Sequence, residues 1–291
     1  LDDYHVIDSK PVDNALTFLL EHLASQMHLV IATRADPPLP IARLRARGEV
    51  TELRAGELRF THAEAAAFLY AVTGIAFTEE HIAVLAKRTE GWAAGLQMAA
   101  ISLRGRQDVS SFVAAFAGSH RFVFDYLLEQ VLSRQTPEVR QFLLKTSVLE
   151  QFSASLCDMV AETGGRARQL LDVLERGNLF LMPLDDERIW YRYHHLFADL
   201  LKLLLEQDQP GLAKELHQRA CNWYEAQGMI SQALSHALEA GNTKLVTRLV
   251  SANVLGLVEQ AELWPILLRM DATLGERAYS LTASDPFSWL R

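Results

Sequence analysis

The sequence predicts a mainly helical protein that begins with a short α/β segment. Residues 1–60 alternate between strand-like and helical apolar patterns, whereas the spacing of apolar residues after Thr61 is almost wholly helical. One stretch within residues 179–193 changes to a period of two, which is typical of a β-hairpin. The chain has 291 residues, of which 49% are hydrophobic and 22% are charged. This length is sufficient for two or three domains, and the composition excludes disordered and fibrous proteins.

Residues 1–60 predict a doubly wound α/β layer with the order strand, helix, strand, loop, strand. The chain opens on apolar residues that look like the end of a buried strand, and residues 13–26 follow with helical spacing. The run Leu29–Ala32 is short, continuous and apolar, as in a strand covered on both faces. Three prolines then end regular structure, and a last strand is expected at 49–54. Because the first residue already lies in an apparent strand, we expect the chain to be a fragment.

Residues 61–118 predict a helical domain. Thr61 and Glu64 form a capping box before the first helix, and Thr78 precedes the second. A third helix is expected after Gly91. The run 118–120, Gly-Ser-His, is typical of a joint between two units, so we place the end of this domain there.

Residues 119–206 predict a winged-helix domain. Its four short helices are expected at 122–132, 137–146, 153–161 and 166–175. They precede two strand-like runs, at 179–182 and 189–193, with Asp185 and Asp186 at the turn between them. Short helices followed by a β-hairpin are the winged-helix arrangement, and a further helix is expected from His194 to Glu206.

Residues 207–291 predict the start of a domain of paired helices. From Leu216 to Gly241 the order of aromatic, alanine and glycine residues resembles one helix-turn-helix repeat of the tetratricopeptide (TPR) type, and a second is expected to begin near Thr243. One repeat cannot bury its own apolar face, so we expect more repeats after residue 291.

Charge and cysteine content restrict the classes of partner. The formal net charge is −8, which argues against a surface devoted to nucleic acid. Acidic residues 185–187 at the expected wing tip would repel phosphates, so we favour a regulatory or protein-contacting wing over a DNA-binding one. The two cysteines have no metal-site spacing, and no apolar run is long enough to span a membrane. A cytoplasmic protein without membrane contact is therefore expected.

The expected strand ends carry the most suggestive polar residues. Asp2 and Asp3 follow the first apparent strand, and Arg34 follows the strand at 29–33. Ligands of open α/β sheets lie beyond the carboxyl ends of the strands, where carboxylates hold Mg²⁺ and a guanidinium contacts phosphate. The alternative is that the aspartates cap the next helix and that Arg34 is a surface arginine.

Other catalytic motifs are missing from the sequence. It contains no H-E-x-x-H zinc motif, no G-x-S-x-G nucleophile elbow and no G-x-x-x-x-G-K-[ST] phosphate-binding loop. A zinc enzyme and a serine hydrolase are therefore not indicated, and the loop that cradles nucleotide phosphates is not in this chain.

Five motifs in order resemble one family. They are Asp2-Asp3-Tyr-His, Ala-Thr-Arg-Ala-Asp-Pro-Pro at 32–38, Leu-Arg-Phe-Thr at 58–61, Glu-Gly-Trp-Ala-Ala-Gly-Leu at 90–96 and Tyr-Arg-Tyr-His-His-Leu-Phe at 191–197. This series resembles the large ATP-dependent LuxR-type transcriptional regulators of the STAND class of signal-transduction NTPases, the group of the bacterial maltose-regulon activator. The resemblance covers nearly the whole chain. It implies that residues 1–60 are the C-terminal part of a P-loop NTPase core and residues 61–118 its helical lid.

The resemblance also implies roles for single residues. Asp2 and Asp3 would belong to the Walker B motif, with Asp2 near Mg²⁺ and Asp3 placed to influence hydrolysis. Arg34 would be the sensor arginine at the γ-phosphate, and Gly91 would begin the lid segment near the adenine. His194 would reach from the winged helix to the β-phosphate of ADP; the alternative is a histidine that caps or packs at a strand-to-helix junction.

For the whole protein, the resemblance implies an ATP/ADP switch with Mg²⁺. An inducer would bind the helical superdomain, ATP-bound subunits would self-associate, and a C-terminal helix-turn-helix outside this chain would bind promoter DNA. Without the phosphate-binding loop, the chain itself is expected to be catalytically silent. The alternative is a non-enzymatic helical scaffold that binds other proteins.

Overall fold

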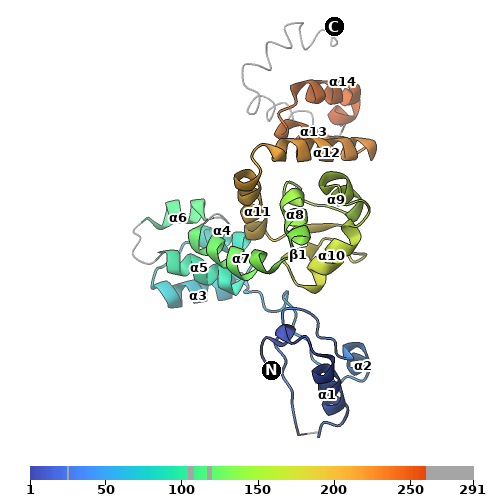
Figure 1. Ribbon diagram of the computed structural model, residues 1–291. Coiled ribbons are helices and arrows are strands. Elements are labelled where there is room, and N and C mark those ends of the chain that lie inside the picture. Colours follow the sequence, from blue (N-terminus) through green and yellow to red (C-terminus); the bar gives the residue numbers. More distant parts are fainter. Residues whose placement is uncertain (25, 104–107, 117–119, 260–291) are drawn as a thin grey trace. The chain divides into compact units, whose positions relative to one another are not determined.

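The computed structural model describes residues 1–24, 26–103, 108–116 and 120–259, and this part of the chain is mainly helical (Figure 1). Two strands, β1 (Leu181–Pro183) and β2 (Tyr191–Tyr193), form a two-stranded sheet. None of the described helices combines the length and the apolar character needed to cross a lipid bilayer.

The residues form two compact units that do not follow the order of the chain. The first contains the described residues of Leu1–Val131, Leu171–Met182 and His194–Phe197, and the second contains Leu132–Leu170, Pro183–Tyr193 and the described residues from Ala198 onward. The first unit therefore includes three pieces of the expected winged-helix region, namely its described residues up to Val131, Leu171–Met182 and His194–Phe197. The expected joint at Gly118 and Ser119 lies outside the described residues.

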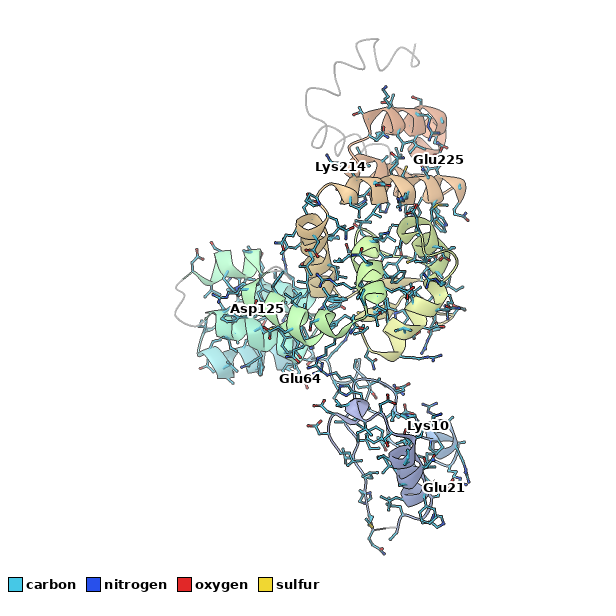
Figure 2. All side chains as sticks on the ribbon, viewed as in Figure 1. Lys10, Glu21, Glu64, Asp125, Lys214 and Glu225 are labelled. Carbon is cyan, nitrogen blue, oxygen red and sulfur yellow. The ribbon has the colours of Figure 1, made fainter. Side chains whose placement is uncertain are left out.

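The α/β start differs from the sequence prediction. The described residues of 1–60 form the 3₁₀ turn η1 (Tyr4–Val6) and the helices α1 (Lys10–Glu21) and α2 (Ile41–Ala46), with Lys10 and Glu21 at the two ends of α1 (Figure 2). The predictions of strands at 29–33 and 49–54 are wrong, because neither segment is assigned as a strand. The helix α2 follows the prolines, where a loop was expected. A parallel strand needs neighbours and cover on both faces. Val30 is 76% exposed and lacks that cover.

Helices with strong capping signals form as predicted in the first unit. The side chain of Thr61 accepts a hydrogen bond from the Glu64 amide, and the Glu64 carboxylate accepts one from the Thr61 amide, so the capping box is confirmed. Thr78 caps the next helix through the His81 amide. The helices of this part are α3 (His62–Thr73), α4 (Glu79–Thr89), α5 (Ala93–Leu103), the unpredicted α6 (Val109–Ala115) and α7 (Arg121–Gln130).

The winged-helix region also follows the predicted order. After the short turn η2 (Leu132–Arg134) come the helices α8 (Pro137–Thr146), α9 (Ala154–Ala161) and α10 (Ala167–Arg176), then β1, β2 and α11 (His195–Asp208). Phe152 and Tyr191 pair as an isolated antiparallel bridge, and the Tyr193 hydroxyl hydrogen-bonds to Thr146 at 2.7 Å. These contacts tie the second strand of the hairpin to the helical part of the second unit.

Paired helices complete the described chain. They are α12 (Leu212–Ala226), α13 (Ile230–Glu239) and α14 (Thr243–Glu259). The apolar face of α12 buries Leu216, Ala220 and Tyr224, and α13 buries Ala233 and Ala237. The small alanines at 220, 233 and 237 let the two helices approach closely. The helical pair is therefore as predicted, and its assignment to the TPR type stays a prediction.

Candidate functional site

Backbone hydrogen bonds bring the two expected strand ends together. The Leu1 amine donates to the Val30 carbonyl at 2.7 Å, and the Ala32 amide donates to the Leu1 carbonyl at 2.8 Å. Leu1 thus hydrogen-bonds to Val30 and to Ala32, the residues on either side of the one opposite to it. This is the hydrogen-bond pattern of two neighbouring parallel segments. The acidic and basic strand ends consequently lie at the same edge, as the sequence predicts.

At this edge Asp3 and Arg34 are linked through His5. Nδ1 of His5 lies 3.8 Å from a carboxylate oxygen of Asp3 and accepts the Arg34 amide at 3.5 Å. Asp2 accepts the amide of Asp3 at 3.0 Å, and both aspartates are exposed. Asp3 has a left-handed backbone, with φ at 50°, just before the 3₁₀ turn η1. Two carboxylates therefore face solvent beside an arginine segment.

A buried tyrosine anchors this turn. The amide of Tyr4 donates to the Ala32 carbonyl at 3.1 Å, and its hydroxyl donates to the Asp13 carboxylate at 2.6 Å. The hydrogen bond to the charged Asp13 raises the pKa of Tyr4 to about 12. Tyr4 is only 1% exposed, so it fixes the position of the two aspartates that precede it.

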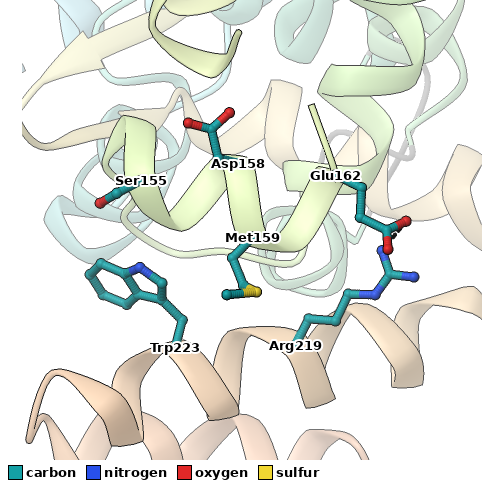
Figure 3. Close-up of a pocket in the computed structure, with 6 residues that line it drawn as sticks. All are labelled: Ser155, Asp158, Met159, Glu162, Arg219 and Trp223. Atoms are coloured by element: carbon teal, nitrogen blue, oxygen red, sulfur yellow. Dashed lines mark ion pairs between the residues drawn. The ribbon is translucent and has the colours of Figure 1, made fainter. Parts of the chain in front are cut away.

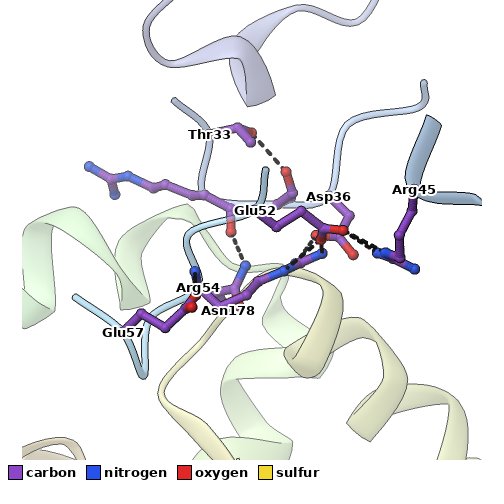
Figure 4. Close-up of polar contacts among 9 residues, drawn as sticks. Thr33, Asp36, Arg45, Glu52, Arg54, Glu57 and Asn178 are labelled. Carbon is purple, nitrogen blue, oxygen red and sulfur yellow. Dashed lines mark hydrogen bonds and ion pairs between the residues drawn. The ribbon is translucent and has the colours of Figure 1, made fainter. Parts of the chain in front are cut away.

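Arg34 is exposed and makes contacts through both its side chain and its backbone. Its guanidinium donates to the Gln130 carbonyl at 3.3 Å. Its own carbonyl accepts the side-chain amide of Asn178, which reaches the 33–36 segment in Figure 4. Beside it, Arg54 pairs with Asp36 and Glu52, so these neighbouring charges are already matched.

The donor set at the strand ends fits a magnesium nucleotide in its chemistry. Asp2 and Asp3 offer carboxylate oxygens, the ligands that Mg²⁺ prefers, and Arg34 offers a guanidinium suited to phosphate. Both aspartates and Arg34 are exposed and so are open to a ligand. The phosphate-cradling backbone loop, however, is not in this sequence.

The other two predicted residues, Gly91 and His194, meet at a second place in the first unit. His194 is 4% exposed, its Nε2 lies 2.8 Å from the Thr89 carbonyl, and its Nδ1 accepts the Leu196 amide at 3.3 Å. Because Nδ1 is the acceptor, Nε2 carries the hydrogen and donates to Thr89. Both ring nitrogens are therefore engaged within the protein, as in the packing alternative.

The environment of His194 disfavours its charged form. Burial lowers its pKa, and this effect outweighs the opposing influence of the Glu90 carboxylate. The rings of Trp92 and Phe180 contact the imidazole edge-on, with centroids at 6.0 and 5.7 Å. The amide of His194 donates to the Phe180 carbonyl at 2.9 Å. We conclude that His194 is a neutral, firmly held histidine.

A tight turn after α4 builds the other side of this contact. Glu90 and Gly91 both have positive φ, 50° and 72°. Gly91 lies so close to the backbone that a Cβ atom there would stand 2.5 Å from the Phe60 carbonyl oxygen. The Gly91 carbonyl in turn accepts the Phe60 amide at 2.8 Å. Glycine is required here by backbone conformation and by space.

Glu90 connects this turn to the start of α11. One carboxylate oxygen accepts the His195 amide at 3.1 Å, and the other lies 3.4 Å from the Arg59 guanidinium. The Glu90 side chain is only 8% exposed, so its charge is matched by these partners. Glu90 begins the 90–96 motif, but no role was predicted for it, because a glutamate at the end of a helix gives no signal of its tertiary partners.

The short segment 178–180 links the two groups of predicted residues. Asn178 bonds to the Arg34 carbonyl, and Phe180 accepts the His194 amide. Both have left-handed backbone, with φ at 48° and 55°. An asparagine after Gly177 is a recognisable signal for this conformation, whereas Phe180 gives none.

The second unit carries a shallow pocket of about 420 Å³ between α9 and α12 (Figure 3). Met159 and Trp223 give it apolar surface. Arg219 is already paired with Glu162 at 2.8 Å and with Glu215, and Asp158 accepts the backbone amides of Gly165 and Ala167. The pocket therefore offers an apolar surface without a free cation for a phosphate.

The wing turn uses one of its three acidic residues for structure. The carboxylate of Asp185 accepts the amides of Ile189 and Trp190 at 2.8 and 2.7 Å. Asp186 and Glu187 remain exposed. Their negative charge keeps the wing unsuited to phosphate contact.

Comparison with known proteins identifies the central region. Residues 128–213 match the MalT winged helix domain. Nine-tenths of the chain is 34% identical to the HTH-type transcriptional regulator MalT of Klebsiella pneumoniae, and 98% of it is 31% identical to MalT of Yersinia enterocolitica. The chain is also 35% identical, over 92% of its length, to the serine/threonine-protein kinase PknK of Mycobacterium tuberculosis. It covers 29%, 31% and 24% of these three relatives.

Proposed function

The chain is MalT-like and contains a MalT winged helix domain, and on this premise we propose that it is the switch segment of an ATP-dependent, inducer-responsive transcriptional regulator. The observation that carries the proposal is the extent of the similarity. It spans the strand ends, the helical part and the winged helix, and not the winged helix alone. The cytoplasm is the compartment in which such a regulator would meet its promoter.

The similarity to PknK bears on how far the proposal extends. A protein named as a kinase shares the same region, so this region does not by itself determine the output of the whole protein. The switch is therefore proposed for residues 1–291, and the transcriptional output for the longer protein.

For the nucleotide, we propose that Asp2 holds Mg²⁺ and that Asp3 accepts the proton of the attacking water. Arg34 would contact the terminal phosphate. Bound Mg²⁺ neutralises phosphate charge, while the carboxylates supply the oxygen ligands and the base. The exposure of all three residues at one edge supports these roles.

For the switch, we propose that His194 exchanges partners. Its Nε2 hydrogen is donated to the Thr89 carbonyl here and would be donated to an ADP phosphate oxygen in the nucleotide-bound protein. A donor already present as Nε2–H needs no change of tautomer for this exchange. Gly91, whose backbone borders the same contact, would transmit the movement to the lid.

For partners, we propose an inducer at the helical superdomain, self-association in the ATP state and promoter binding by a separate domain. The non-enzymatic scaffold is the less favoured alternative. It would not account for carboxylates and a guanidinium gathered at one edge.

The test uses the longer protein in a promoter-directed transcription assay with Mg²⁺-ATP, Mg²⁺-ADP or no nucleotide. We expect transcription only with ATP and inducer present. The isolated chain of 291 residues is the matched control, and we expect it to show no ATP turnover, because the loop that binds phosphates is absent. Nucleotide-independent transcription, or Mg²⁺-dependent turnover by the isolated chain, would overturn the proposal.

A further inference from the structure

Two histidines face each other across the contact between α12 and α13, in the second unit. Nδ1 of His217 lies 2.8 Å from Nδ1 of His236, and their ring centroids are 5.0 Å apart. His236 is 9% exposed, and its ring also stacks on Tyr224 with a centroid distance of 5.3 Å and an interplanar angle of 17°. Neither the predicted switch nor the pocket uses this pair.

The geometry permits only certain protonation states. A hydrogen bond between two ring nitrogens needs one donor and one acceptor, so exactly one of the facing Nδ1 atoms carries hydrogen. A first proton can be taken up at an outer nitrogen, which leaves the hydrogen bond intact. A second proton puts hydrogen on both facing nitrogens. The acceptor is then lost, and two positive rings meet at 2.8 Å.

The surroundings of His217 favour its neutral form. Burial is the main cause that lowers the pKa of His217; Lys202 on α11 acts in the same direction, while Glu239 on α13 opposes it. Tyr224 on α12 offers His236 a ring face, and its hydroxyl donates to the Gln151 carbonyl at 3.2 Å. On the α14 side, Arg248 is paired with Glu225, which is labelled in Figure 2.

We propose that His217 and His236 form a proton-sensitive contact that holds α12 and α13 together while one facing nitrogen is free of hydrogen and loosens them when both are protonated. Loosening would expose the apolar residues around the pair, including the fully buried Cys221 one turn after His217. The contact between α12 and α13 thereby responds to pH changes near or below neutrality, independently of nucleotide.

The sign of the pH effect follows from linkage. In the unfolded chain both histidines bind protons near pH 6.5. In the folded chain the pair resists the second proton. The unfolded state therefore binds more protons below pH 6.5, and stability falls as the pH drops.

The experiment measures urea unfolding of the 291-residue chain between pH 7.5 and pH 5.0, with His217→Gln, His236→Gln and the exposed control His62→Gln. Glutamine keeps a hydrogen-bonding amide and does not titrate. We expect the unfolding equilibrium constant of the parent and the control to rise about tenfold more over this range than that of either glutamine variant. Equal rises in all four proteins would overturn the proposal.

A second measurement keeps the proposal testable if a variant does not fold. In the unchanged chain, ¹⁵N resonances of the two imidazoles should show a coupled titration, with the second proton bound about one pH unit or more below the first. Two independent single-step titrations near pH 6.5 would overturn the proposal.

Discussion

The imidazole of His194 donates its Nε2 hydrogen to the backbone carbonyl of Thr89 at 2.8 Å, which joins the start of α11 to the end of α4. The same carbonyl accepts the Trp92 amide at 2.8 Å. The Thr89 carbonyl oxygen thus binds both the turn that contains Gly91 and His194, the residue predicted to contact nucleotide. A ligand that takes the His194 hydrogen would release one of the two bonds on this oxygen.

The pKa of His194 should depend on Glu90. Burial lowers this pKa and the Glu90 carboxylate opposes the shift, so Glu90→Gln should lower it further. A depressed histidine pKa means that stability is full above about pH 6.5 and falls as the pH drops toward the folded-state value. The fall should extend to lower pH in Glu90→Gln.

Imidazole NMR of His194, together with urea unfolding at several pH values, checks this prediction. Glu79→Gln is the control, because Glu79 is exposed and pairs with His62. A His194 that titrates at pH 6.5 or above in the parent would contradict the structure.

Gly91→Ala should destabilise the first unit far more than Gly74→Ala. Both glycines have φ near 70°, but the new Cβ meets the Phe60 carbonyl at 2.5 Å in one case and nothing within 4 Å in the other. Gly74→Ala should therefore lower the free energy of unfolding by about 1 kcal/mol through backbone conformation alone. Gly91→Ala should lower it by a further ~1–3 kcal/mol because the new Cβ overpacks the site. Denaturant midpoints of the two variants measure the difference, and equal midpoints would show that the close approach at Gly91 is not present.

Local capping chemistry sets the start of several helices that the sequence predicted. Thr61, Thr78 and Ser153 each cap a helix through a side chain within three residues, so short-range signals were sufficient. The hairpin was equally readable, because Asp185 and the alternating residues around it lie close in sequence.

The features that the sequence could not predict depend on contacts between residues that lie far apart in the sequence. The strand at 29–33 was inferred from its apolar character, yet Val30 is exposed, and the segment bonds to Leu1 and Tyr4 without being assigned as a strand. Asp3 and Arg34 do lie close together, as predicted, each in contact with His5, although the segments that carry them are not assigned as strands. Glu90 and Phe180 were missed, because their roles arise from contacts with residues about a hundred and about fourteen positions away.

Asp2 and Asp3 should have separable effects in the longer protein. Asp2→Asn should raise the Mg²⁺-ATP concentration needed for activation by about tenfold or more, because a charged metal ligand is lost. Asp3→Asn should slow hydrolysis by about a hundredfold and prolong the active state, because a base is lost. Asp8→Asn, an exposed residue a few positions away, is the control.

Nucleotide titrations and single-turnover hydrolysis distinguish the two roles. If both variants keep the affinity, turnover and transcription of the parent, the carboxylates serve only the local turn.

The most direct test of the nucleotide switch is the rate of ADP release from the longer protein, compared between His194→Ala and His195→Ala. A hydrogen bond to a charged phosphate contributes about 1.5–3 kcal/mol, so His194→Ala should release ADP roughly ten to a hundred times faster and raise inducer-independent transcription. His195→Ala should have a smaller effect, because it keeps the backbone amide that donates to Glu90 and loses only the longer contact, of 3.7 Å, between His195 Nε2 and the Glu90 carboxylate. ADP held by His194→Ala as tightly as by the parent, with only a lower melting temperature, would contradict the switch and leave His194 as a packing residue.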